Sequence, residues 1–233
     1  MKTIGLLGGM SWESTVTYYQ IINETVKQEL GGLHSAQLLL YSVDFQAIEA
    51  CQSSGNWQRS AELLNIGIQS LEKGGADFIV ICTNTMHKII PLLQPAPAIP
   101  ILHIAEATAN ELQKNHIKQV ALLGTKYTME QDFYKDKLTA AGIQVLTPPP
   151  TDRTRINQII YDELCLGNIL PSSKTEFLRI IADLSQQGAQ GVILGCTEIG
   201  LLIRQEDTPL PVFDATIFHG KAAVSLALAA IPK

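Results

Sequence analysis

The chain has 233 residues, which is enough for one large domain or two small ones. Hydrophobic residues make up 46% of it and charged residues 17%. This composition supports a buried core and excludes an intrinsically disordered chain. The formal net charge is −5, and the 17 Lys and Arg residues form no dense run. A nucleic-acid partner is therefore not expected.

The cysteines of the chain are Cys51, Cys82, Cys165 and Cys196, and none of them forms a C-x-x-C pair. Their spacing argues against a zinc site built from thiolates. The N-terminal segment is too short and too rich in glycine for a secretory signal, and no apolar run reaches the ~18 residues of a membrane span. We therefore expect a cytoplasmic protein with reduced thiols and no membrane partner.

The first half of the chain alternates apolar runs with helical patterns. A first strand ends at Gly8-Gly9, and a helix is predicted to begin after Ser11 and to end at Gly31-Gly32. Its apolar residues recur at steps of three and four: Tyr19, Ile22, Val26 and Leu30. Two further strands are predicted over Leu38–Tyr41 and Phe78–Ile81, because continuous apolar runs are typical of parallel strands covered on both faces. A helix through Leu64, Ile68 and Leu71 lies between them.

The second half repeats this alternation. The stretch Pro95–Pro100 is expected to lead into it from the first half. Strands are predicted over Val120–Leu123 and Val192–Leu194, with a helix over Phe177–Leu184 before the second of them. The last apolar segment, Lys221–Ile231, is predicted to form a helix that returns to pack on the first half.

Three pairs of segments indicate that the chain contains one α/β unit twice. The paired segments begin at Lys2 and Lys118, at Gly75 and Gly188, and at Ile99 and Leu210, in the same order and at a nearly constant offset. We therefore predict an α/β protein of two pseudo-symmetric open halves, flavodoxin-like or Rossmann-like, whose parallel sheets face a shared cleft. The first half would comprise residues 1–98 and 209–233, and the second residues 99–208.

The repeat aligns Thr83 with Cys196, each at the end of a predicted strand, and Cys82 with Gly195. Inversion at the Cα of an amino acid removes a proton from one face and returns one to the other, so two opposed proton-carrying groups suit it. A thiol fits this task because its pKa of ~8.5 lies near working pH. Short polar residues at the same strand ends are candidates to hold a carboxylate: Asn84, Thr85 and Thr197.

Several motifs in order carry a resemblance to a known family: Gly8–Thr15, Ser42–Phe45, Asn84–His87 and Gly195–Ile199. The chain resembles the cofactor-independent aspartate/glutamate racemases essentially from Ile4 to His219. It is more similar to the aspartate racemases than to the glutamate racemases of cell-wall synthesis, which carry Asp-Ser at Gly8-Gly9 and His at Glu198. The resemblance implies two α/β halves, a cleft active site, a homodimer, no pyridoxal phosphate, no metal, and two cysteines as acid and base.

The chain departs from this pattern at one of the two cysteines. The resemblance places the second cysteine at Cys196, but Thr83 occupies the position of the first. Cys82 stands one residue earlier, and a one-residue shift along a strand reverses the side chain, so Cys82 is expected in the core. In the family the Cys196 position deprotonates L substrates. We therefore predict that Cys196 deprotonates an L-amino acid, that Thr83 reprotonates the opposite face, and that turnover is better from L, as in L-selective aspartate/glutamate racemases.

A second departure concerns the substrate pocket. Related aspartate racemases clamp the distal carboxylate with basic residues at positions that fall near Gln52 and Cys165, and neither residue is basic. The candidate cations to replace them are Arg59, Lys126, Arg153 and Arg155. A range of amino acids broader than Asp and Glu therefore stays open. The glycine loop predicts a ligand contact at Met10, and its counterpart in the repeat predicts contacts at Thr125 and Thr128.

Plainer interpretations stand beside these. Cys196 can be a buried structural thiol, and His87 can support Thr83 or merely pack. Asp44 and Glu198 are candidates to orient ligand or backbone. Two other functions stay open: a decarboxylase or cis–trans isomerase of the same superfamily acting on a dicarboxylate, and an amino-acid-binding protein that has lost catalysis.

Overall fold

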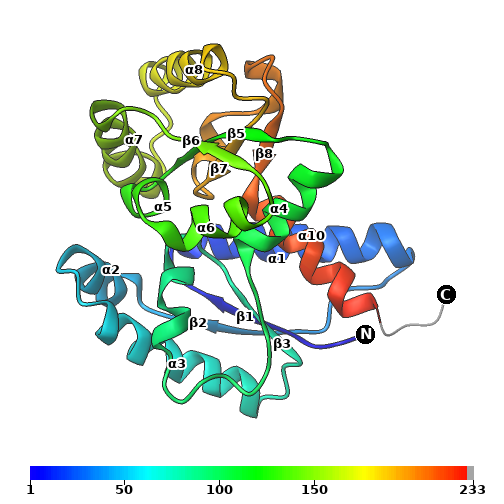
Figure 1. Cartoon of the computed structure of the whole chain (residues 1–233). Helices are drawn as coiled ribbons and strands as arrows, with labels where there is room; N and C mark the ends of the chain where they lie inside the picture. Colours follow the sequence, from blue (N-terminus) through cyan, green and yellow to red (C-terminus); the bar gives the residue numbers. More distant parts are fainter. Residues whose placement is uncertain (230–233) are drawn as a thin grey trace. The chain divides into compact units, whose positions relative to one another are not determined.

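The computed structural model describes residues 1–229, which fold into two α/β units (Figure 1). Unit 1 comprises Met1–His103 together with the residues from His219 onward, and unit 2 comprises Ile104–Phe218. Within the described residues, no helix has both the length and the apolar composition of a membrane span.

Unit 1 is built on a parallel sheet with the strand order β2-β1-β3-β4. Its strands are β1 (Ile4–Gly8), β2 (Leu38–Ser42), β3 (Phe78–Ile81) and β4 (Ile101–Leu102). Its helices are α1 (Trp12–Leu30), α2 (Phe45–Ser53), α3 (Trp57–Lys73), the 3₁₀ segment η1 (Thr85–Leu92) and most of α10 (Ala215–Leu228). One face of the sheet packs against α1 and α10, and the other packs against α2, α3 and η1.

Unit 2 repeats this plan with the strand order β6-β5-β7-β8. Its strands are β5 (Gln119–Gly124), β6 (Gln144–Leu146), β7 (Val192–Gly195) and β8 (Val212–Asp214). Its helical segments are α4 (Ile104–Lys114), α5 (Lys126–Glu130), α6 (Asp132–Ala140), α7 (Pro150–Asp162), η2 (Leu164–Leu166), α8 (Pro171–Gln186), α9 (Ile199–Leu202) and η3 (Gln205–Asp207). Helices α4 and α6 cover one face of the sheet, and α7 and α8 cover the other.

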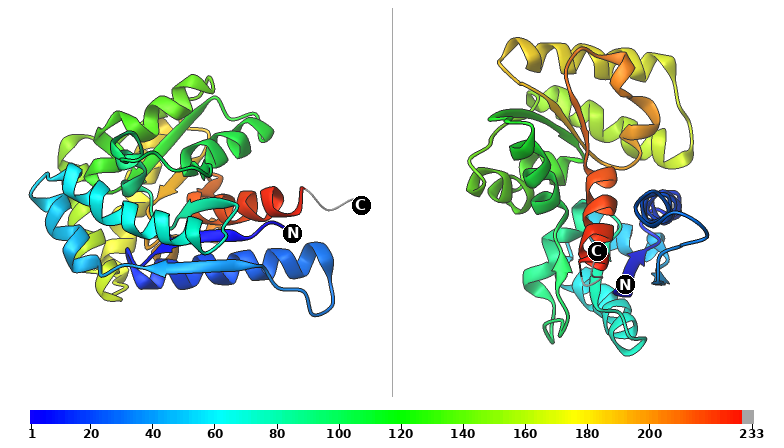
Figure 2. Two further views of the ribbon diagram at one scale, coloured as in Figure 1. Left: turned by 90° about the horizontal axis from the view of Figure 1, so that it is seen from below. Right: turned by 90° about the vertical axis from the view of Figure 1, so that its right-hand side faces the viewer.

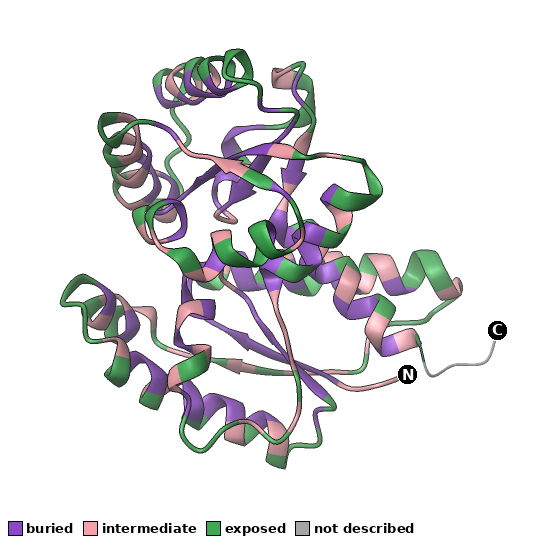
Figure 3. Cartoon of the chain, in the orientation of Figure 1, coloured by how far each residue is buried: buried purple, intermediate pink, exposed green. Residues whose placement is uncertain are grey.

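The predicted α/β repeat is confirmed by these topologies. The second strand of each unit in chain order lies at one edge, the first and third pair in the centre, and the fourth lies at the other edge. The central strands β1 and β3 are buried throughout, as are β7 and most of β5 (Figure 3). Continuous apolar strands of this kind need helices on both faces, and each sheet has them.

Helix α1 shows where the apolar pattern identifies the element but assigns the wrong tyrosine to its buried face. The helix begins after Ser11, whose hydroxyl oxygen accepts a hydrogen bond from the Ser14 amide, and it ends at Gly31 as predicted. Its buried face carries Tyr18, whereas the predicted Tyr19 is 53% exposed. Spacing explains the difference, because Tyr18 lies four residues before the buried Ile22 and therefore shares its face.

The connections between the units differ from those the sequence predicts. The chain leaves unit 1 after His103 and returns at His219, later in both cases than the boundaries after residues 98 and 208. Strand β4 follows Pro95–Pro100 and pairs with β3, so this stretch lies inside unit 1 and its prediction as the inter-half linker is wrong. Strand β8 pairs with β7 and therefore belongs to unit 2.

The C-terminal helix α10 returns to unit 1 as predicted (Figure 2). Ala223, Val224 and Ala227 pack in the apolar cluster that also contains Tyr18 and other residues of α1. The Lys2 amide donates to the Ala227 carbonyl at 2.9 Å, which ties the end of the helix to the start of β1. The predicted helix also included residues 230 and 231, which lie outside the described part of the chain.

A buried histidine fastens α10 to the sheet. His219 is 0% exposed, its Nε2 lies 2.9 Å from the Leu102 carbonyl oxygen, and its Nδ1 lies 2.8 Å from the Tyr18 hydroxyl. A carbonyl only accepts hydrogen bonds, so Nε2 carries the proton and Nδ1 accepts from Tyr18. Burial is the main cause that lowers the pKa of His219 to about 3, and the nearby His87 lowers it further.

We predict that His219 makes the protein sensitive to acid. The folded protein resists protonation of this imidazole down to a pKa of about 3, whereas an unfolded chain binds that proton near the ordinary 6.5. The stability due to neutral His219 is therefore complete above pH 6.5 and is lost as the pH falls toward 3. His219→Gln keeps a donor for Leu102 but cannot titrate, so the gap in urea unfolding free energy between wild type and variant should narrow over this range. The exposed His34→Gln variant serves as control, and a gap for His219→Gln that stays constant with pH would contradict the prediction.

Candidate active site

Thr83 and Cys196 occupy the same position in the two units. Leu7 of β1 pairs with Ile81 of β3, and Leu123 of β5 pairs with Leu194 of β7. Strands β1 and β5 each end at the glycine after these leucines. Counting from Ile81 and Leu194, Thr83 and Cys196 both come two residues later, at the carboxyl end of the third strand. The structure therefore supports the alignment that the sequence repeat suggested.

Cys82 points into the core of unit 1, as predicted. The residue is 0% exposed and packs among the apolar side chains that β3 shares with α1 and α10. Burial raises the pKa of its thiol far above the ordinary value. A thiol held neutral in an apolar core is a poor candidate for proton transfer.

Cys196 has a chemically different environment. It is partly buried, and its Sγ lies 3.0 Å from Oε2 of Glu198, which is only 6% exposed. The thiol donates this hydrogen bond, because an ionised carboxylate only accepts. Removal from water raises the pKa of the Cys196 thiol well above its ordinary value, and the Glu198 carboxylate and the Cys165 thiol raise it further. The Cys196 thiol is therefore protonated and hydrogen-bonded to the Glu198 side chain.

The other predicted residues of unit 2 gather around the ends of β5 and β7. Thr125 caps α5 by accepting from the Thr128 amide at 3.4 Å. Thr128 is 0% exposed, and a Cβ added at Gly195 would lie 3.2 Å from its methyl group, so Thr128 packs against the strand end. The Thr197 hydroxyl oxygen accepts from Thr216 at 3.4 Å. Cys165 in η2 packs on the same apolar cluster as Cys196.

In unit 1, Asn84 has the environment of a ligand-binding residue. It follows Thr83 at the end of β3 and is only 3% exposed. Neither the oxygen nor the nitrogen of its side-chain amide has a hydrogen-bond partner among the described residues. A buried amide without partners costs about 1–3 kcal/mol, and such groups are rare in folded proteins unless a ligand or water completes them. The neighbouring Thr85 is also buried.

Met10 and Gln52 lie on other segments of unit 1. Met10 follows β1, is 4% exposed and packs in the apolar cluster on the α3 side of the sheet. Gln52 of α2 is 4% exposed, and its amide nitrogen lies 2.9 Å from the Met86 sulfur. Gln52 therefore contacts η1, the segment that starts at Thr85. Asp44 caps α2 through the Gln46 amide at 3.2 Å, so it orients backbone.

A glycine brings two loops of unit 1 together at the same edge of the sheet. Gly9 follows β1 with φ +89°, and an added Cβ would lie 2.3 Å from the Val43 carbonyl oxygen after β2. Only glycine fits this close approach. The Gly9 amide also donates to the Thr15 hydroxyl at 2.8 Å, which fixes the loop on α1.

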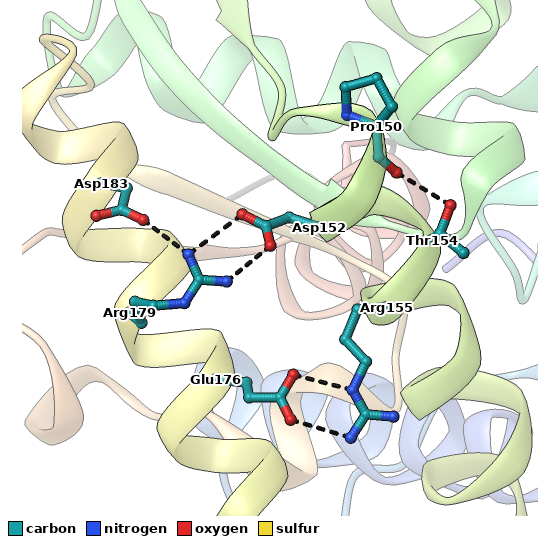
Figure 4. A network of polar contacts seen from close by, with 7 residues as sticks. All are labelled: Pro150, Asp152, Thr154, Arg155, Glu176, Arg179 and Asp183. Atoms are coloured by element: carbon teal, nitrogen blue, oxygen red, sulfur yellow. Dashed lines mark hydrogen bonds and ion pairs between the residues drawn. The ribbon is translucent and has the colours of Figure 1, made fainter.

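Three of the four alternative cations are engaged in ion pairs. Arg155 of α7 makes a two-point contact with Glu176 of α8, at 2.9 and 3.0 Å (Figure 4). Arg153 binds Glu130 at 3.0 Å, and Arg59 binds Glu62 at 2.8 Å. Lys126 follows Thr125 at the end of β5 and is exposed. Arg179 reinforces the α7–α8 contact through Asp152 at 2.7 Å (Figure 4).

Two features of the strand ends were not identified from the sequence. The contact of Glu198 with the Cys196 thiol spans two residues, and no motif distinguishes it from an ordinary solvated glutamate. Asp214 ends β8, where burial raises the pKa of its carboxyl to about 6. Within residues 1–229, no three His, Cys, Asp or Glu side chains are arranged to hold a metal ion.

Two α/β repeats carry a threonine and a cysteine at equivalent strand ends, and comparison with known proteins identifies the family. The model of the Asp/Glu/hydantoin racemases matches residues 7–223, so the chain belongs to that family. The predicted family resemblance is confirmed.

Similar proteins span nearly the whole chain. The broad specificity amino-acid racemase RacX of Bacillus subtilis (strain 168) is 25% identical over 229 residues, which cover 97% of this chain and 98% of RacX. The crystal structure of a candidate Asp/Glu racemase from Yersinia pestis superposes with a TM-score of 0.91, at 53% identity over 98% of this chain and 100% of that one. An aspartate racemase homologue from Pyrococcus horikoshii OT3 gives 0.84, at 34% identity over 97% and 99%.

We predict that Glu198→Gln lowers the pKa of the Cys196 thiol. The substitution removes the neighbouring negative charge and supplies an amide that can donate to a thiolate. The pH profile of Cys196 alkylation by iodoacetamide, followed by mass spectrometry of the peptide, should therefore shift to lower pH. The exposed Glu206→Gln variant is the control. An unchanged or upward-shifted profile in Glu198→Gln would show that Glu198 does not hold the thiol in its protonated form.

Proposed function

We propose that this chain is an amino-acid racemase that needs neither pyridoxal phosphate nor a metal, and that Cys196 and Thr83 move the Cα proton. One observation carries the proposal: the two residues occupy the same strand-end position in two copies of one fold. Membership of a racemase family supports the reaction type. Inversion needs one group for each face of Cα, and a duplicated fold supplies one such group from each copy.

Cys196 is proposed to act on the L enantiomer. Glu198 takes the thiol proton through the 3.0 Å contact, and the resulting thiolate takes the proton from Cα. The electron pair of the broken C–H bond moves onto Cα and its carboxylate. The α-ammonium of the bound substrate would stabilise the negative charge of this thiolate.

Thr83 is proposed to complete the inversion. Its hydroxyl gives a proton to the opposite face of the carbanion, and the alkoxide recovers a proton from water. Glu198 then gives the thiol proton to the hydroxide that remains, and Cys196 keeps the Cα proton, so all three side chains return to their starting states. The carbanion is a far stronger base than an alkoxide, so this donation is favourable. The reverse step, removal of a Cα proton by a threonine hydroxyl, is slow because that group is a very poor base at neutral pH.

The substrate carboxylate is proposed to satisfy Asn84. The buried amide of this residue, which has no hydrogen-bond partner in the described part of the chain, lies directly after Thr83. Thr85, Thr125 and Thr197 are proposed as further contacts, and Met10, Gln52, Thr128 and Cys165 as lining residues. The substrate set is proposed as L-Asp, L-Glu or a broader group of amino acids. The ion pairs of Arg59, Arg153 and Arg155, and the broad specificity stated for RacX, support the broader group. A homodimer in the cytoplasm stays a prediction.

Thermodynamics limits the form that L preference can take. Enantiomers have equal free energy in water, so kcat/KM must be the same from L and from D. A preference for L can therefore appear only as a higher kcat that is offset by a proportionally higher KM. It can also appear in the fraction of carbanions that are protonated on each face. If Thr83 is the weak base, most carbanions return to L through Cys196, and only a minority are inverted.

This division predicts an unequal exchange with solvent deuterium. In D₂O with an L substrate, deuterium should enter the remaining L enantiomer faster than D enantiomer forms. From the D substrate, deuterium should appear in the L product while the remaining D stays largely unlabelled. Chiral chromatography with mass spectrometry measures both, first on Asp and Glu and then on neutral and basic amino acids. Equal labelling of both remaining substrates would overturn the L assignment. No labelling would indicate a binding protein, and a loss of mass would indicate a decarboxylase.

Substitutions at the two positions should separate their roles. Cys196→Ser should lower the rates of both deuterium exchange and inversion by about 10²–10⁴-fold. Thr83→Val should lose inversion but keep the exchange of deuterium into the L enantiomer. Thr83→Cys should raise kcat from D, because a second thiol replaces the weak base. Cys82→Ala is the matched control, since it removes the neighbouring thiol from the core. If Thr83→Cys gives no gain, or if Cys82→Ala matches the loss in Cys196→Ser, the proposed pair is wrong.

A further inference from the structure

We infer that His87 is a positioning residue that fixes the backbone of Thr83, so that the threonine hydroxyl can deliver its proton. The inference rests on the proposed function and assigns a role to a buried side chain outside the proton-transferring pair. It follows from contacts within unit 1 alone.

Both backbone polar groups of Thr83 are held. Its amide donates to the Ile81 carbonyl at 2.9 Å, which makes a tight turn directly after β3. Its carbonyl oxygen lies 2.9 Å from Nδ1 of His87. The Thr83 side chain, by contrast, has no hydrogen bond among the described residues and is partly exposed. A backbone fixed at both ends with an uncommitted hydroxyl is the arrangement that proton delivery needs.

The contact fixes the tautomer of His87. A carbonyl oxygen only accepts, so Nδ1 of His87 carries the proton and donates to Thr83. His87 is 1% exposed, and burial is the main cause that lowers its pKa to about 3. The imidazole is therefore neutral and has this one tautomer at the pH where the reaction would run.

Neighbouring rings hold the His87 imidazole in place. Its centroid lies 4.7 Å from that of His103, which follows β4, and 5.6 Å from that of His219 on α10. His219 is fixed in turn by Tyr18 and by the Leu102 carbonyl. The position of Thr83 is thus linked through three imidazoles to β4, α10 and α1.

In unit 2 the position equivalent to His87 carries no imidazole, and the repeat shows which residue stands there. The segment pairs that align Thr83 with Cys196 also align His87 with Gly200 and His103 with Asp214. A Cβ added at Gly200 would lie 2.7 Å from Oδ2 of Asp214, so a side chain of any size would collide there. The Cys196 carbonyl instead accepts from the Ile199 amide at 3.1 Å. Unit 1 therefore has an imidazole that supports the backbone, whereas unit 2 has a carboxylate that contacts the reactive thiol.

A positioning role predicts a specific kinetic change. If Thr83 shifts, the carbanion formed by Cys196 still returns to L but is inverted less often. His87→Ala should therefore lower inversion about 10–100-fold, the range expected for a displaced catalytic group. Exchange of deuterium into the remaining L substrate should fall much less. The ratio of retained exchange to inversion should rise accordingly.

Conservative variants separate positioning from folding. His87→Asn places an amide nitrogen the same number of bonds from Cβ as Nδ1, so it should restore the ratio toward the wild-type value. His87→Gln places its nitrogen one bond further and should restore it less. The measurement uses the full-length protein in D₂O, with the L-amino acid that the wild type converts fastest, and a thermal midpoint for each variant.

The outcomes are distinguishable. A rise in the ratio for His87→Ala that His87→Asn reverses supports the inference. Exchange and inversion that fall together, in step with the thermal midpoint, would show that His87 only stabilises the fold and would overturn it. A wild-type protein without any exchange would overturn the proposed function itself, and that result is visible before any His87 variant is made.

Discussion

The alternation of side chains along a parallel strand determines which residue at each strand end is available for chemistry. Cys82 and Thr83 are neighbours after β3, yet the thiol of Cys82 is buried in an apolar cluster while Thr83 is partly exposed. At the end of β7 the same register places Gly195 in the buried position and Cys196 in the available one. A shift of one residue in either strand would exchange the buried and the available positions. The register of the strand therefore determines which side chain is available for chemistry.

The duplicated fold then separates into two different chemical environments. In unit 2, removal from water and a contacting carboxylate keep the Cys196 thiol protonated. In unit 1, a neutral histidine holds the backbone and leaves a hydroxyl that donates far better than it accepts. A strong base on one side and a weak base on the other would make proton removal easy from only one enantiomer. The asymmetry in the proposed reaction thus follows from the different contacts made at the two equivalent positions, Thr83 and Cys196.

Patterns that depend on local spacing were predictable from the sequence. Continuous apolar strands, the cap at Ser11 and the core position of Cys82 all follow from period and chain order, and the structure confirms them. The boundary between the units was displaced because β4 and β8 are only two and three residues long, too short to show a period. The apolar pattern does not distinguish Tyr18 from Tyr19, because one lies four residues and the other three residues before the buried Ile22.

The supporting contacts were not predictable, because they join residues far apart in the chain or depend on one rotamer. His219 contacts Tyr18 and Leu102 across more than a hundred positions, and sequence spacing carries no record of such contacts. The hydrogen bond between Cys196 and Glu198 is local but depends on how both side chains turn at the strand end. The Asn84 amide has no hydrogen-bond partner within residues 1–229, and this depends on the positions of all its neighbours in space, which sequence spacing does not give.

The most direct test of the central claim exchanges the two groups. In the double variant Thr83→Cys/Cys196→Thr, the strong base would stand in unit 1 and the weak one in unit 2. The account predicts that the exchange pattern inverts, so that in D₂O deuterium enters the remaining D enantiomer faster than L enantiomer forms. An active double variant that still labels L, or that labels both enantiomers equally, would contradict the claim that Thr83 and Cys196 are the opposed pair.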